Sequence, residues 1–158
     1  VDLIIRVCAD NPFISIELIE KLFELYNGED YCSFSYPGNI PTILGHVGVF
    51  SEITTISALK KIAKLTNDKF YLEHVTNFLY KKNDEFKVKL HPIESLLVNY
   101  ENVRLTVDTK SDFDISKKLF EKFSVIKNVQ DLQKMIDYIN LNNVFLESMK
   151  LQINNNSK

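Results

Sequence analysis

The stretch that decides the fold is Leu3-Ile4-Ile5-Arg6-Val7-Cys8-Ala9-Asp10-Asn11-Pro12-Phe13. Its dense run of Leu, Ile and Val, cut off by Asn-Pro, is typical of a strand that is buried on both faces of a parallel sheet. Asp10 then stands at the carboxyl end of that strand. Because ligands bind at this edge of open α/β sheets, the sequence predicts that Asp10 meets a substrate or a cation.

A second predicted strand, far along the chain, ends in the same way. Apolar and polar residues alternate over 103–107, and Asp108 follows just before a capping-box pattern that starts a helix. We expect residues 3–7 and 103–107 to lie close together, with Asp10 and Asp108 at one edge. Such a pair suits Mg²⁺, which takes one or two protein carboxylates and completes its shell with water and phosphate oxygens. The alternative is that Asp10 only forms a turn before the proline and Asp108 only helps to start a helix.

The rest of the chain alternates helical and strand patterns. Helices are predicted after Ser15, after Thr55 or Ser57, and after Thr109, since each of these residues can cap the helix that follows it. The pattern predicts an α/β fold with a mainly parallel sheet covered by helices. Nothing in the sequence has the form of a Walker loop or of G-x-G-x-x-G, so no glycine-rich phosphate cradle is predicted.

Length and composition suit one soluble globular domain. The chain has 158 residues, of which 45% are hydrophobic and 25% are charged. We place the domain at residues 1–151 and expect the polar residues 152–158 to be a disordered tail. Cys8 and Cys32 lack metal-ligand spacing and are interpreted as core thiols rather than a disulfide.

The charge distribution and the lengths of the apolar runs argue against two classes of partner. The 19 basic and 21 acidic residues give a net charge of −2, with no basic block of the kind that binds nucleic acid. No apolar run approaches the roughly 20 residues that span a bilayer, so no membrane partner is expected. We therefore predict a cytoplasmic protein.

Four blocks, in this order, resemble the spore coat polysaccharide biosynthesis cytidylyltransferase family, which is similar to the cytidylyltransferases that activate acylneuraminate and 3-deoxy-manno-octulosonate. The resemblance covers about residues 1–122. The blocks are Arg6-Val7-Cys8-Ala9-Asp10-Asn11-Pro12-Phe13-Ile14, Gly48-Val49-Phe50-Ser51-Glu52, Glu73-His74-Val75-Thr76-Asn77-Phe78 and Arg104-Leu105-Thr106-Val107-Asp108-Thr109-Lys110-Ser111-Asp112.

The resemblance implies a fold and an activity. The fold would be that of the nucleotide-diphosphosugar transferases, and the reaction would transfer CMP from CTP to a sugar acid, with Mg²⁺ shared by Asp10 and Asp108. Carried over by position, Glu52 and His74 would lie near the acceptor sugar. The alternatives without a functional role are a solvated acid for Glu52 and an exposed helix residue for His74. No residue is assigned to the nucleotide, and homodimer formation stays open.

Two departures from the family pattern qualify the resemblance. Family members often carry Arg where this chain has Leu72, and their amino-terminal basic loop has no counterpart here. The resemblance therefore implies a chain that is truncated at the N-terminus, and we expect this chain alone to bind CTP poorly and not to turn over. A metal-dependent glycosyltransferase of related fold and a non-catalytic interaction domain remain as alternatives.

Overall fold

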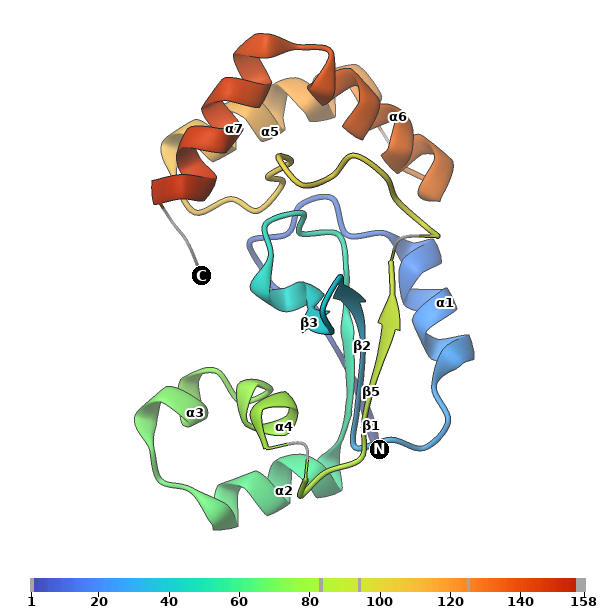
Figure 1. The fold of residues 1–158 in the computed structure, drawn as a ribbon, viewed down its shortest axis with the longest axis vertical. Helices are drawn as coiled ribbons and strands as arrows, with labels where there is room; N and C mark the ends of the chain where they lie inside the picture. The colour runs from blue at the N-terminus through green and yellow to red at the C-terminus, as the bar shows by residue number, and fades with distance from the viewer. Residues whose placement is uncertain (1, 83, 94, 125, 156–158) are drawn as a thin grey trace.

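The computed structural model describes residues 2–82, 84–93, 95–124 and 126–155 (Figure 1). Within these residues a five-stranded sheet has the order β1, β4, β2, β3, and β5 pairs with β2 from outside this path. The strands are β1 (Leu3–Arg6), β2 (Tyr31–Tyr36), β3 (Ile40–Pro41), β4 (Glu52–Thr55) and β5 (Val88–Pro92). A short 3₁₀ turn, Thr42–Leu44, follows β3.

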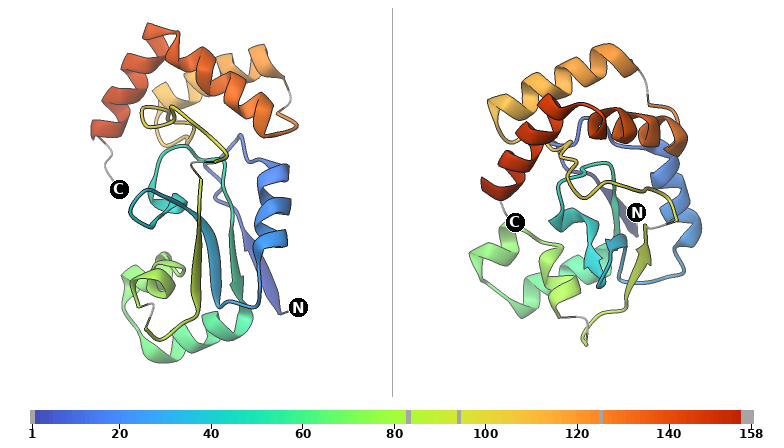
Figure 2. Two further views of the ribbon diagram at one scale, coloured as in Figure 1. Left: turned by 45° about the vertical axis from the view of Figure 1, so that its right-hand side comes forward. Right: turned by 45° about the horizontal axis from the view of Figure 1, so that its top comes forward.

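Helices surround this sheet, as the views in Figures 1 and 2 agree. One helix lies along the sheet, three gather near the end where β1 begins, and three form a cap at the opposite end. They are α1 (Ile16–Leu25), then α2 (Ile56–Leu65), α3 (Lys69–Glu73) and α4 (Asn77–Lys81), then α5 (Lys110–Phe123), α6 (Val129–Asn140) and α7 (Asn143–Asn155). The expected α/β class, a central sheet flanked by helices, is confirmed.

The strand directions differ from the mainly parallel sheet that the sequence predicted. Among the described strands, β1–β4, β2–β3 and β2–β4 pair antiparallel, and β2–β5 is the parallel pair. The first strand is also less buried than expected, since Ile5 is 43% exposed. A dense apolar run therefore identified a strand correctly but not its direction: such a run is typical of parallel sheets, whereas here it pairs antiparallel with β4 and is only partly buried.

The expected strand over residues 103–107 forms no ladder with another strand in the described part of the chain. It is an extended segment, held by hydrogen bonds from Leu105 N–H to the His46 carbonyl at 2.9 Å and from Val107 N–H to the Asp10 carbonyl at 2.8 Å. The expected closeness to the first strand is thus realised beyond the end of β1, at Asp10.

The predicted helix starts are confirmed by their caps. The side chains of Ser15, Thr55 and Thr109 each accept a backbone N–H of the helix that follows, and Thr109 forms a full capping box with Asp112. The tail departs from expectation, because α7 continues through Asn155 and residues 152–155 are helical. Residues 156–158 of the expected tail lie outside the described residues. None of the described helices has the length and apolar character that crossing a membrane requires.

Gly48 allows the loop before β4 to pass between two other segments. Its φ of +64° lies in the left-handed region, and a Cβ placed there would be 2.8 Å from Thr106 Cγ2 and 3.0 Å from Asn11 Oδ1. The first distance is shorter than real Cβ contacts, and the second is tighter than most of them. The loop therefore needs glycine for its backbone conformation and for its close packing.

We predict that Gly48→Ala lowers the free energy of unfolding by about 2 kcal/mol or more, because left-handed strain and overpacking add. Gly28→Ala is the matched control, since Gly28 has a φ of +82° but no atom within 4 Å of the added Cβ. Its loss should stay near about 1 kcal/mol, from strain alone. Chemical denaturation of both variants measures the difference, and equal losses would refute the packing argument.

Candidate functional site

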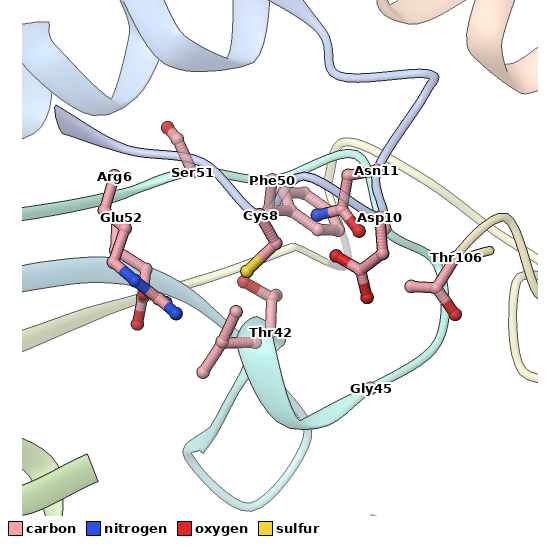
Figure 3. Close-up of a pocket in the computed structure, with 12 residues that line it drawn as sticks. Arg6, Cys8, Asp10, Asn11, Thr42, Gly45, Phe50, Ser51, Glu52 and Thr106 are labelled. Atoms are coloured by element: carbon pink, nitrogen blue, oxygen red, sulfur yellow. The ribbon is translucent and has the colours of Figure 1, made fainter. Parts of the chain in front are cut away.

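A pocket opens where β1 ends, beside the loop that leads into β4 (Figure 3). It holds about 370 Å³ of space that no atom fills, part of it open to solvent. Two of the predicted site residues, Asp10 and Glu52, line this pocket. The full lining is Arg6, Cys8, Asp10, Asn11, Thr42, Ile43, Gly45, Gly48, Phe50, Ser51, Glu52 and Thr106.

Asp10 is half-buried, and its carboxylate points into the pocket, on the side that faces Thr42 and away from Thr106 (Figure 3). Within the described residues this carboxylate has no ion-pair partner and accepts no hydrogen bond from a backbone N–H. A turn-forming role would require such a bond, so the turn at this point, closed by Asn11 N–H on the Cys8 carbonyl at 3.2 Å, does not use the acid. The Asp10 carboxylate is therefore available to a ligand.

Three buried polar atoms of the pocket lining also lack a partner among the described protein groups. They are Asn11 Oδ1, Thr42 Oγ1 and Ser51 Oγ, and Thr42 and Ser51 are only 4% and 1% exposed. Buried polar atoms are normally hydrogen-bonded to protein, water or ligand. Figure 3 shows the Ser51 hydroxyl on the side of its strand that points away from Thr42 and Asp10, so Asn11 and Thr42 are the groups that the pocket offers to an occupant. Sequence reasoning missed them because single Asn and Thr residues carry no spacing signal.

Glu52 lies at one end of the pocket and is 2% exposed. Its carboxylate accepts hydrogen bonds from Arg6 of β1, from the Tyr31 hydroxyl of β2, and from the Thr76 hydroxyl at 3.3 Å. Figure 3 shows the Arg6 and Glu52 side chains next to each other. The alternative that Glu52 is a solvated acid is therefore wrong, since protein groups surround this carboxylate.

The charge states around Glu52 follow from this arrangement. Burial by itself lowers the pKa of Arg6, but the charge and hydrogen bond of Glu52 outweigh burial, so the pKa is raised. Burial, and then the Glu52 charge, raise the pKa of Tyr31 well above its ordinary value. Tyr31 therefore stays protonated and donates to the carboxylate.

His74, the second residue expected near the sugar, lies elsewhere. It is exposed at the C-terminal end of α3, where its ring packs edge-on against Phe70 with 5.2 Å between centroids, and it is not among the residues that line the pocket. Thr76, two residues further on in the same sequence block, makes the contact with Glu52 instead. The structure thus brings Glu52 and Asp10 to one pocket and leaves His74 outside its lining.

Asp108 belongs to a second network, centred on Arg104. The Arg104 side chain is fully buried, and it donates to Asp112 at 2.9 and 3.1 Å, to Asp108 Oδ2 at 2.6 Å and to His46 Nδ1 at 2.6 Å. Burial alone raises the pKa of Asp112, but the hydrogen bond from Arg104 and two backbone N–H groups reverse this and lower it. Thr109, not Asp108, caps helix α5, so the alternative helix-starting role of Asp108 is not the one observed.

The structure brings the backbones of the two predicted metal ligands together. Val107 donates to the Asp10 carbonyl, and Asp108 is the next residue. The Asp108 side chain is 39% exposed and has one oxygen on Arg104, while Asp108 is not part of the pocket lining. No cluster of three or more His, Cys, Asp or Glu side chains that could hold a metal occurs among the described residues. A shared Mg²⁺ site, which needs only one or two carboxylates, stays a prediction.

The sequence matches the cytidylyltransferase family over residues 1–151. Because this match covers nearly the whole chain, the protein belongs to that family. The blocks around Asp10, Glu52, Thr76 and Asp108, which the structure connects through hydrogen bonds, are those on which the resemblance was recognised.

Two curated proteins are similar to this chain. The chain is 31% identical over 123 residues to the spore coat polysaccharide biosynthesis protein SpsF of Bacillus subtilis, covering 75% of this chain and 47% of SpsF. It is 40% identical over 144 residues to the uncharacterized protein MJ1063 of Methanocaldococcus jannaschii, covering 89% of this chain and 54% of that protein. The chain thus spans about half the length of the curated relatives it matches.

A solved structure has the same fold. It is a cytidylyltransferase from Leptospira borgpetersenii serovar Hardjo-bovis, with a TM-score of 0.73 and 21% sequence identity, and the match covers 92% of this chain and 59% of that one. At this identity the likeness establishes the fold, and the residues of the site have to be argued from this chain itself.

We predict that Glu52→Gln lowers the free energy of unfolding by about 2–3 kcal/mol, because it leaves Arg6 and two hydroxyl donors without their shared carboxylate. Glu85→Gln is the control: its carboxylate is exposed and 3.9 Å from Lys61 Nζ, so it should cost less than about 0.5 kcal/mol. Denaturant titration at neutral pH compares the two, and a Glu52 variant as stable as the control would contradict the interpretation of this network.

Proposed function

We propose that this chain is part of a nucleotidyltransferase that moves CMP from CTP to a sugar acid in surface-polysaccharide biosynthesis, with Mg²⁺ as its cofactor. Membership of the cytidylyltransferase family supports the nucleotide, and the name of the relative SpsF supports the polysaccharide role. The observation that carries the proposal is the Asp10 carboxylate, which faces a polar pocket without a cation of its own.

The donors of the site suit the proposed cofactor. Asp10 offers two carboxylate oxygens, and Asp108 keeps Oδ1 clear of the Arg104 contact, which uses Oδ2. Hard oxygen donors are what Mg²⁺ prefers, and it commonly leaves the rest of its shell to water and phosphate oxygens. Bound there, Mg²⁺ would supply charge neutralisation and orientation for the triphosphate.

The chain's own residues would then hold the two substrates for in-line attack of a sugar oxygen on the α-phosphorus, with pyrophosphate leaving. Asp10 and Asp108 would orient the nucleotide from the carboxyl end of β1 and from the start of α5. Asn11 Oδ1 and Thr42 Oγ1, which have no partner among the described protein groups, would bond substrate polar atoms in the pocket. Glu52 closes one end of that pocket, consistent with a place beside the acceptor sugar. Holding both reactants in one orientation is itself a large share of the rate gain in such transfers.

We predict that Asp10→Asn and Asp108→Asn each lower kcat/KM for CMP transfer by about 100-fold or more, since loss of metal charge stabilisation is worth several kcal/mol. The assay is pyrophosphate release by the full-length protein from CTP, with a panel of sugar acids, at several Mg²⁺ concentrations. Asp114→Asn is the matched control, because Asp114 is an exposed carboxylate of α5 paired with Lys110. It should stay within about twofold of the parent protein.

Other outcomes of this assay would overturn the proposal. Cleavage of CMP-sugar or UDP-sugar without pyrophosphate release would instead indicate a glycosyltransferase. Absence of any turnover, with folding intact, would indicate a non-catalytic interaction domain. If both aspartate variants turn over at the wild-type rate, the metal assignment is wrong, but the proposed transfer reaction is not contradicted.

His74 has its own test, since we propose it as a sugar contact although it lies outside the pocket lining. We predict that His74→Ala raises the KM for the sugar acid more than the KM for CTP, by about 10-fold, a loss typical of one hydrogen bond to a charged group. Steady-state kinetics with each substrate varied in turn measure both constants. Unchanged constants for both substrates would assign His74 to the exposed surface of α3.

A further inference from the structure

Arg104 occupies an unusual place for a charged side chain, because it is fully enclosed within the protein. Its guanidinium nevertheless has acceptors on three sides. Two hydrogen bonds go to Asp112 of α5, one goes to Asp108, and one goes to His46 in the loop that follows the 3₁₀ turn. A guanidinium held by this many acceptors cannot rotate without breaking several of them, so its orientation is fixed.

Asp112 fixes one side of the guanidinium. Its own oxygens also accept the N–H groups of Asp108 at 3.1 Å and of Thr109 at 2.9 Å. The carboxylate therefore joins the start of helix α5 to Arg104. The backbone and the side chain of Asp108 are therefore both anchored, the first to Asp112 and the second to Arg104.

His46 fixes the opposite side. Arginine carries donors only, so His46 Nδ1, 2.6 Å from Arg104 Nη1, must accept, and the imidazole is then neutral with its proton on Nε2. The His46 carbonyl also accepts N–H groups of Leu105 at 2.9 Å and Thr106 at 3.3 Å. This histidine therefore ties the pocket loop, whose Gly45 and Gly48 line the pocket, to the segment before Asp108.

Asp108 is the most exposed member of this network, with 39% of its side chain exposed, while His46 is only half-buried and Arg104 and Asp112 are buried. An exposed carboxylate normally samples several rotamers, and ordering it on a cation costs side-chain entropy. Here Arg104 holds Oδ2 at 2.6 Å, and the Thr106 hydroxyl lies 3.4 Å from the same oxygen. The other oxygen, Oδ1, is presented in one direction before any ligand arrives.

We propose that Arg104 is a positioning residue that presents Asp108 Oδ1 to the cation, and that His46 completes this function by accepting from Arg104 on the pocket side. The inference rests on the proposed function, in which Asp108 is a metal ligand. Groups that orient a metal ligand without touching the metal are worth about 10- to 100-fold in metal affinity. The same loss is expected when the orientation of Asp108 is released.

The test compares two substitutions of His46 in the full-length protein. His46→Leu removes the acceptor, whereas His46→Asn keeps an oxygen near the position of Nδ1. The first readout is direct Mn²⁺ binding in the presence of CTP, followed by electron paramagnetic resonance. The second is the Mg²⁺ concentration that half-saturates pyrophosphate release. His46→Leu should weaken both by about 10-fold while the KM for CTP at saturating Mg²⁺ changes little, and His46→Asn should stay within about threefold.

Arg104→Lys provides a second variant, because lysine keeps the charge but cannot fork between two carboxylates and a histidine. We expect a loss of up to about 100-fold in Mn²⁺ affinity. Because Arg104 is buried, this variant is the one most prone to misfold. The two His46 variants therefore decide the test. Asp114→Asn again serves as the control on α5.

The outcomes separate this inference from the proposed function. If Asp108→Asn weakens Mn²⁺ binding but His46→Leu does not, the positioning role is overturned and the metal assignment stands. If both His46 variants weaken binding equally, the acceptor role of Nδ1 is overturned. If Asp108→Asn leaves Mn²⁺ binding unchanged, the metal assignment of the proposed function fails, and this inference fails with it.

Discussion

The buried carboxylate of Glu52 is the contact on which the candidate site depends. It lies on β4, between the two strands that supply Arg6 and Tyr31, and it also accepts from Thr76 just before α4. Breaking a buried ion pair on one side costs about 3–5 kcal/mol, so these segments cannot shift independently. The position of Arg6 in turn fixes the end of β1, four residues before Asp10.

The charges of the site are unevenly balanced, and this favours a cation. Arg6 is neutralised by Glu52, and Arg104 is neutralised by Asp112 and shared with Asp108. Asp10 lies between these two networks, and in the part of the chain that the structure describes no basic side chain pairs with it. A triphosphate entering such a site would meet carboxylates rather than free arginines. A divalent cation resolves this repulsion, which is the physical reason for proposing Mg²⁺.

Local signals in the sequence predicted local structure well, and long-range geometry less well. Ser15 and Thr109 were recognised as caps, and Thr55 as one of two candidates beside Ser57, because a cap and its helix are neighbours in sequence. The adjacency of Asp10 to the Asp108 segment also followed from where two apolar runs end. Strand direction did not follow, since the direction of pairing depends on how the connecting segments route the chain and not on the residues of one strand. The partners of Glu52 are 21 to 46 residues away in sequence, and no spacing rule connects them. Within one sequence block, only the folded backbone decides that Thr76 reaches Glu52 while His74 faces solvent.

The pocket also contains buried polar groups that lower the stability of the fold, and a stability argument alone does not explain them. Asn11, Thr42 and Ser51 each bury a polar atom that has no partner among the described protein groups, at about 1–3 kcal/mol apiece when nothing bonds it. Gly48 lets the pocket loop pass close to Asn11 and Thr106. Apolar residues would remove this cost and would also remove the hydrogen bonds available to an occupant. Buried polar groups of this kind can be met by ordered water, and an occupant that replaces the water has to supply equivalent hydrogen bonds. Under the proposed function, Asn11 and Thr42 would be binding capacity that the fold maintains at the expense of its own stability.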